Sequence, residues 1–236
     1  DDERITHFVV VINDGDYTLN QIHTLRRAIK DFRSSGKKAI AYTDNFGGFS
    51  NGIGEYWLAT AFDEIWLNPL GLLSINGIRV EQPFFKEALG KVGVTMEAEQ
   101  REAYKTGAEM YLRQSMSQEN RETMQAIIDD IMDVMMSDIE EARSIAQYKQ
   151  RLSINKSPLL ADDALELGFV DHIGSMNDLE TALKGDNQDR KDLFVGLSRY
   201  AKDMRSGLKG WSDRPTIAVV DLDGMIIDME KMANEN

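Results

Sequence analysis

The chain has 236 residues, of which 42% are hydrophobic, and its 40 acidic and 27 basic side chains give a formal net charge of −13. This length allows one large α/β domain with a substantial core, or one domain with pieces of a second. The acidic balance argues against a surface that tracks phosphates, so we predict no nucleic-acid partner. The absence of cysteine excludes disulfides, thiolate metal sites and cysteine nucleophiles.

The hydropathy of the sequence predicts no membrane-spanning segment. No stretch approaches the roughly 20 apolar residues that a spanning helix needs. The chain opens with Asp-Asp-Glu-Arg rather than with a signal peptide. If the natural protein has a membrane anchor, we therefore expect it outside this sequence.

The beginning of the chain predicts a βαβ unit. Residues 7–12 (HFVVVI) are a continuous apolar run rich in β-branched side chains, which is typical of a strand buried on both faces in a parallel sheet. Thr18 and Gln21 form a capping box for a helix that ends near Ser34, and residues 39–43 predict the second strand. Because no earlier strand is available to flank the first one, we expect that the domain lacks its opening strand.

Residues 51–71 (NGIGEYWLATAFDEIWLNPLG) predict a buried helix that leads directly into a short buried strand. The helical part is apolar on nearly every side, so it must be covered all round. The strand over residues 65–67 is stopped by Pro69. Gly52 and Gly54 let backbone N–H groups and the positive helix end approach a reacting group closely. In several hydrolytic α/β folds a nucleophile lies at such a helix start.

The residues at this helix start do not form an evident catalytic pair. The candidates for a nucleophile are Ser50, Asn51 and Ile53, and none has a base beside it in the sequence. No phosphate-binding loop or dinucleotide fingerprint follows the glycines, and we predict no metal and no cofactor. The histidines share no ligand spacing and are expected to be structural: His7, His23 and His172.

The middle of the chain predicts a helix over residues 82–92, a strand over residues 94–98 and a long helix over residues 118–146, capped by Ser117. The apolar side chains of the first helix are expected to face inward: Phe84, Phe85, Ala88 and Leu89. The long helix carries a Met- and Ile-rich stripe, which we interpret as ordinary core plus edge, with a partner surface as the alternative. The acid pairs on its polar face are expected to be solvated.

The carboxy-terminal third predicts three further elements and then a change of composition. A helix is expected within residues 158–168, a strand and turn over residues 169–174, and a helix over residues 178–184. Residues 185–215 are polar and charge-mixed, which favours a linker. Residues 216–222 (TIAVVDL) again predict a buried strand, and we interpret residues 216–236 as the opening strand of a second domain.

Lys105 is the candidate whose context is least ordinary, because it directly follows Tyr104 in a segment of moderate polarity. A lone lysine is most often a surface charge. A lysine acts as a general base only as the neutral amine, which requires that the side chain be removed from water. From the residues alone, both interpretations stay open.

Four blocks of sequence, taken in order, resemble a known family: EYWLATAFDEIWLNPLG, PFFKEALGKVGV, REAYKTGAEMYLRQSMS and PLLADDALELGFVDHIG. Together they are similar to the amino-terminal half of the long, two-domain bacterial signal peptide peptidases, also called protease IV. These are serine peptidases of family S49 in the ClpP/crotonase-like superfamily. The resemblance covers almost the whole chain.

The resemblance implies a Ser-Lys dyad, in which a neutral lysine takes the proton from the attacking serine. Tyr104-Lys105-Thr106 matches the lysine motif of the amino-terminal half, so the resemblance implies that Lys105 is the general base. The serine comes from the carboxy-terminal half of these proteins, and Ile53 stands where that half carries it. Residues 13–16 (NDGD) replace the Pro-Gly-Gly oxyanion loop of the catalytic half.

The resemblance also implies a fold, a location and partners. We expect an α/β fold of ClpP/crotonase type, with stacked βαβ units, a twisted and mostly parallel sheet over residues 1–184, and a long helical arm. The parent protein would degrade cleaved signal peptides or other apolar extended peptides, bound by strand addition, at the periplasmic side of the bacterial inner membrane. Further expected partners are its own carboxy-terminal domain and other copies in a homo-oligomer. The fragment itself would be soluble and inactive.

Two other functions are compatible with the residues. An acyl-CoA hydratase or isomerase of the same superfold would need paired acids and an oxyanion loop, and neither is visible in the sequence. A non-catalytic scaffold half would serve in oligomerisation, with Lys105 as an ordinary surface residue. Substitution of Lys105 distinguishes the scaffold from the dyad.

Overall fold

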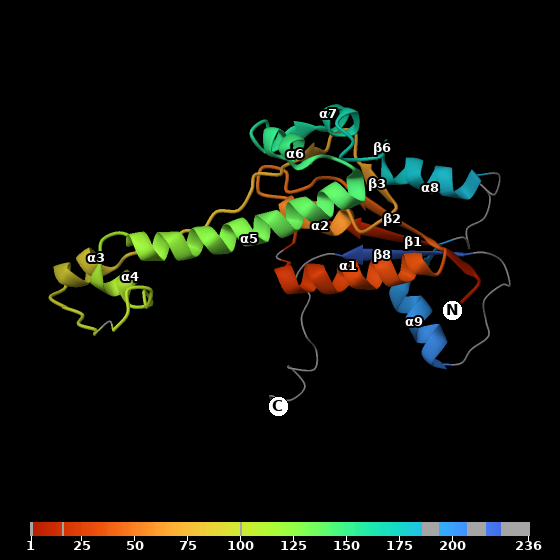
Figure 1. The fold of residues 1–236 in the computed structure, drawn as a ribbon. Helices are drawn as coiled ribbons and strands as arrows, with labels where there is room; N and C mark the ends of the chain where they lie inside the picture. The colour runs from red at the N-terminus through yellow and green to blue at the C-terminus, as the bar shows by residue number, and fades with distance from the viewer. Residues whose placement is uncertain (1, 16, 100, 186–193, 207–215, 223–236) are drawn as a thin grey trace. The chain divides into compact units, whose positions relative to one another are not determined.

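The computed structural model (Figure 1) describes residues 2–15, 17–99, 101–185, 194–206 and 216–222. Its internal contacts divide the chain into two compact units, residues 1–76 with 138–236, and residues 77–137. The second unit is an insertion in the sequence of the first. None of the helices in these described residues is long and apolar enough to cross a membrane.

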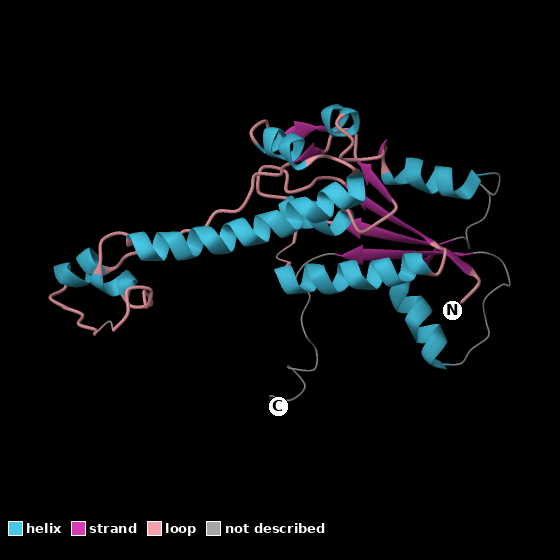
Figure 2. Ribbon diagram, viewed as in Figure 1, coloured by secondary structure: helices cyan, strands magenta, loops and turns pink. Residues whose placement is uncertain are grey.

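A six-stranded sheet forms the centre of the first unit (Figure 2), and every neighbouring pair of its strands is parallel. The strand order is β6-β3-β2-β1-β8-β7. The strands are β1 (Ile5–Ile12), β2 (Lys38–Thr43), β3 (Glu64–Leu67), β6 (His172–Ile173), β7 (Phe194–Gly196) and β8 (Thr216–Leu222). A separate antiparallel pair consists of β4 (Leu72–Leu73) and β5 (Leu159–Leu160). The predicted α/β class with a mostly parallel sheet is confirmed.

Six helices of the first unit lie wholly within it: α1 (Leu19–Ser34), α2 (Ile53–Ala59), α6 (Gln147–Ile154), α7 (Ala161–Glu166), α8 (Met176–Lys184) and α9 (Leu197–Ser206). Helix α1 connects the parallel neighbours β1 and β2, and α2 precedes β3, so the predicted βαβ repeats are confirmed. The capping box of Thr18 and Gln21 is present at the start of α1. Local capping and apolar spacing therefore determine these elements.

Helix α2 is buried on nearly every side, as its sequence predicts. Six of its seven residues are buried, from Ile53 to Ala59 with Gly54 excepted. The Tyr56 ring packs edge-on against Phe46 and Phe169, with ring centroids 5.3 and 5.6 Å away. The Tyr56 hydroxyl donates a hydrogen bond to the carbonyl oxygen of Phe169 at 2.8 Å, and burial raises the pKa of Tyr56. This aromatic cluster holds α2 in the core beside the sheet.

The second unit contains α3 (Lys86–Lys91), α4 (Glu109–Leu112) and most of α5 (Gln118–Arg143), which continues into the first unit. The predicted cap of α5 is confirmed, because the hydroxyl of Ser117 accepts a hydrogen bond from the N–H of Asn120 at 3.1 Å. Only part of the predicted apolar stripe is buried: Met135, Met136 and Ile139. Ile127, in the middle of the stripe, is 48% exposed.

Two predictions in the second unit are wrong. Helix α3 spans only Lys86–Lys91 and contains no buried residue, so the expected inward face over residues 84–89 does not exist. Pro83 keeps Gln82 out of a helix, since the residue before a proline avoids the helical region, but it does not account for the start at Lys86. Residues 94–98 form no strand. A strand needs a pairing partner, and the described residues of this unit supply none.

The carboxy-terminal assignments also differ from the structure. The predicted linker over residues 185–215 contains β7 and α9, with residues 186–193 and 207–215 outside the described residues. Strand β8, assigned by prediction to a second domain, pairs with β1 over most of its length and lies in the same sheet. It thereby flanks β1 on the side where a missing opening strand was expected. The rest of the assigned segment, residues 223–236, lies outside the described residues.

Candidate functional site

The carboxyl ends of β1 and β2 are tied together where ligands usually bind to a parallel sheet. The Thr43 hydroxyl donates a hydrogen bond to the Ile12 carbonyl at 2.6 Å. The carboxylate of Asp14 accepts a hydrogen bond from the N–H of Gly47 at 3.2 Å. Residues 13–16 were expected to replace the oxyanion loop. Within them, Asp14 supplies a carboxylate that fixes the neighbouring glycine turn by this hydrogen bond.

At the start of α2, where a nucleophile was considered, the described residues form no catalytic pair. Ile53 is the first residue of α2 and is 6% exposed, so its aliphatic side chain belongs to the core. The Ser50 hydroxyl donates to the carbonyl of Gly47 at 2.6 Å. The Asn51 side-chain oxygen accepts from the N–H groups of Ile53 and Asn76, at 3.3 and 3.2 Å. Ser50 and Asn51 therefore shape the loop, and Ile53 fills the core.

Replacing Gly52 with alanine should destabilise the protein by about 1 to 3 kcal/mol, because a Cβ there would overlap fixed backbone. It would lie 2.6 Å from the Gly47 nitrogen and closer still to the Phe46 carbonyl. The midpoint of urea unfolding measures the loss. Gly90→Ala is the matched control, since nothing lies within 4 Å of its Cβ, and an unchanged midpoint in Gly52→Ala would contradict the close approach.

Lys105 lies in the turn between α3 and α4, in the second unit. Its side chain is exposed, and its backbone N–H donates to the carbonyl of Glu102 at 3.0 Å. Among the described residues, no acceptor forms a hydrogen bond or ion pair with its ammonium group. The structure thus places Lys105 on an ordered turn, but the described residues do not provide the desolvation that a lysine base needs.

The Lys105 turn is attached to the start of α5 through Tyr104. The Tyr104 hydroxyl donates to Glu122 at 3.0 Å, and Gln118 donates to the other oxygen of the same carboxylate at 2.8 Å. The hydrogen bond to Glu122 raises the pKa of Tyr104. Tyr104 therefore fixes the predicted Tyr104-Lys105 motif to α5, while the Lys105 side chain remains exposed.

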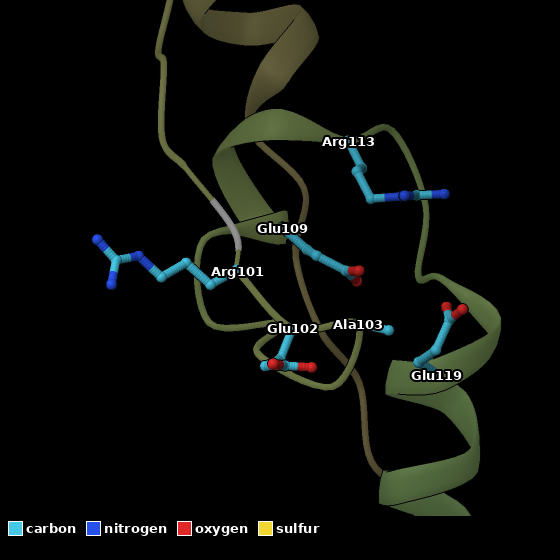
Figure 3. A pocket seen from close by; sticks show the side chains of 6 residues that line it. All are labelled: Arg101, Glu102, Ala103, Glu109, Arg113 and Glu119. Carbon is cyan, nitrogen blue, oxygen red and sulfur yellow. The ribbon is translucent and has the colours of Figure 1, made fainter.

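A polar pocket of about 270 Å³ adjoins this turn. It is lined by Arg101, Glu102, Ala103, Glu109, Arg113 and Glu119 (Figure 3). Glu109 and Arg113 project into it from α4 and the residue that follows, whereas Arg101 points away. Glu109 was not among the predicted site residues, because a lone glutamate in a short helix carries no periodic signal of burial.

The other sequence candidates do not form a site. His7, His23 and His172 lie on β1, α1 and β6, and the described residues contain no group of three His, Cys, Asp or Glu side chains able to hold a metal. The His172 ring packs against Trp66, with centroids 4.5 Å apart, and burial lowers the pKa of His7. The acid pairs of α5 are exposed, as predicted.

Comparison with known proteins agrees with the blocks of sequence described above. The chain is 31% identical over 244 residues to protease 4 of Haemophilus influenzae, covering 98% of this chain and 38% of that protein. It is 25% identical to the chloroplastic serine protease SPPA of Arabidopsis thaliana, covering 95% of this chain and 33% of that protein. A mutant of the membrane-bound stomatin-specific protease 1510-N is a structural neighbour, with a TM-score of 0.37, 12% identity, and coverage of 74% and 83% of the two chains.

The chain thus spans about a third of the length of the curated relatives that it matches. Residues 31–189, well over half of the chain, match the family described as Peptidase family S49. This segment contains β2, β3, the whole second unit and the turn that carries Lys105. The chain belongs to peptidase family S49.

Proposed function

We propose that the protein containing this chain is a serine endopeptidase with a Ser-Lys dyad, in which Lys105 is the general base and the serine lies outside residues 1–236. The observation that carries this proposal is that the chain contains the candidate base but has no nucleophile at the helix start where the family's catalytic half carries its serine. Lys105 is presented on a turn that is held at Tyr104, whereas Ile53 occupies the helix start where a nucleophile would lie. Membership of family S49 supplies the reaction class.

The proposed chemistry needs only a serine, a lysine and donors for the oxyanion. The neutral Lys105 amine takes the proton from the serine hydroxyl as its oxygen attacks the peptide carbonyl, and it then protonates the leaving amine. For this transfer the amine nitrogen and the serine oxygen must lie about 2.6 to 3.2 Å apart. The remainder of the protein would bring the serine to Lys105 and remove its amine from water.

The substrates and partners in this proposal follow the family. Apolar extended peptides, such as cleaved signal peptides, would bind by strand addition. The carboxy-terminal half of the same protein would supply the serine, and further copies would complete a homo-oligomer at the periplasmic face of the bacterial inner membrane. A dyad of this type requires no metal and no cofactor.

A serine-directed fluorophosphonate provides a test of the divided site. In the full-length protein, we expect the reagent to modify one serine outside residues 1–236, as located by mass spectrometry of the digested protein. Ser50→Ala is the matched control and should be labelled like the wild type, because the Ser50 hydroxyl donates to the loop carbonyl of Gly47. A labelled serine within this chain, with turnover lost on its replacement, would contradict the proposal.

A scaffold function is the second candidate, and the exposure of Lys105 favours it. In that case the chain would contribute only to assembly, and the ammonium group would remain a solvated charge. The dyad and the scaffold differ in what they require at position 105, because only the base needs an amine that can lose its proton.

A further inference from the structure

Glu109 is a buried carboxylate beside the Lys105 turn, and its side chain accepts hydrogen bonds from two residues. Only 3% of the residue is exposed. Its Oε2 atom accepts hydrogen bonds from the N–H of Ser117 at 3.2 Å and from Nδ2 of Asn120 at 3.1 Å. Nδ2 of Asn120 also donates to Gln82 at 2.9 Å. Glu109 thus links α4 to the start of α5, and Asn120 continues the connection to Gln82 before α3.

The charge of Glu109 suits this position. Burial opposes its ionisation, but the hydrogen bonds from Ser117 and Asn120 outweigh that effect, so the pKa of Glu109 lies below its ordinary value. The carboxylate also lies at the amino-terminal end of α5, where the helix dipole favours a negative charge. At neutral pH the side chain is therefore an anion with partners provided by the first turn of α5.

The backbone of Glu109 continues this link to Lys105. Its N–H donates to the carbonyl of Thr106, the residue after Lys105, at 3.0 Å. On the other side, the N–H of Lys105 donates to the carbonyl of Glu102 at 3.0 Å. The backbone around Lys105 is therefore closed into consecutive turns, and the Glu109 side chain joins the last of them to α5.

We infer that Glu109 is a positioning residue for Lys105, which holds the lysine turn against the start of α5 through its hydrogen bonds to Ser117 and Asn120. This inference rests on the proposed role of Lys105 as the base. A base transfers a proton efficiently only within hydrogen-bond reach of its partner, and a displacement of about 1 Å can lower the rate about 100-fold. Glu109 does not touch the reacting atoms and acts through the backbone of the turn.

The test uses turnover of an apolar peptide by the full-length protein. Glu109→Ala removes both hydrogen bonds and should lower kcat about 10- to 100-fold, with KM changed by less than about twofold, because the base is displaced while substrate binding is untouched. Glu109→Gln keeps a side-chain oxygen for the same two donors and should stay within about threefold of the wild type. Glu119→Ala, from the same pocket, is the matched control and should behave as the wild type.

Several outcomes would overturn the inference. They are a wild-type kcat in folded Glu109→Ala, a change in KM alone, or an equal loss in Glu109→Gln. If Glu109→Ala does not fold, Glu109→Asp decides in the same way, since its shorter side chain keeps the charge but withdraws the oxygen from Ser117. Lys105→Ala in the same series separates the two proposals: its retained turnover would reject the dyad, whereas its inactivity beside a wild-type Glu109→Ala would reject only the positioning role.

Discussion

Lys105→Ala should lower kcat/KM of the full-length protein for an apolar, signal-sequence-like peptide by about 1,000-fold or more. The substitution removes the only group that the proposal assigns to proton transfer from the serine, and the hydroxyl is a weak nucleophile without a base. Peptide hydrolysis measures the loss, and circular dichroism shows whether the variant still folds. Because the side chain is exposed and has no described polar partner, we expect the fold to be unaffected.

Two further variants make this result specific. Lys105→Arg keeps a positive charge and a long side chain, but a guanidinium group does not lose its proton near neutral pH, so we expect the same loss. Lys91→Ala, an exposed lysine at the end of α3, is the matched control and should keep full activity. Retained turnover in Lys105→Ala or Lys105→Arg would reject the dyad and leave the scaffold function.

Asp138→Ala should destabilise the protein by about 3 kcal/mol, because it removes the counter-ion of a buried arginine. One carboxylate oxygen of Asp138 accepts hydrogen bonds from Arg26 at 2.9 Å and from the indole N–H of Trp57 at 2.8 Å. The Arg26 side chain is 4% exposed and also donates to Thr60 at 2.6 Å and to the Trp57 carbonyl. Without Asp138, a buried guanidinium and an indole N–H both lose a partner.

Urea unfolding of the single and double variants measures this effect. Asp138→Asn keeps a side-chain oxygen for Trp57 and should lose less stability than Asp138→Ala. Arg26→Met combined with Asp138→Ala should cost clearly less than the sum of the two single changes, since both act on one ion pair. Asp130→Ala, on the exposed face of α5, should change stability by less than about 0.5 kcal/mol. Strict additivity would contradict the coupling of Arg26 with Asp138.

Local patterns in the sequence determined much of the first unit. The apolar runs of β1 and β2, the capping box at Thr18 and the all-round apolar helix α2 were predicted and are confirmed. Capping and periodicity depend on residues only a few positions apart, so they can be recognised without knowledge of the fold. The four ordered blocks likewise identified family S49. The role of Lys105 stays a prediction, because the structure describes its turn and no serine partner.

Pairing between distant segments was decided only by the tertiary structure. The pattern of residues 216–222 identifies a strand, but backbone N–H and C=O groups are the same in every strand, so the pattern does not reveal that β8 pairs with β1. For the same reason, residues 94–98 resemble a strand and have no partner among the described residues. Arg26 and Asp138 are 112 positions apart in the sequence, and the buried carboxylate of Glu109 accepts its hydrogen bonds from Ser117 and Asn120, at the start of α5. A buried charge depends on partners that folding brings together, and no local pattern in the sequence predicts these partners.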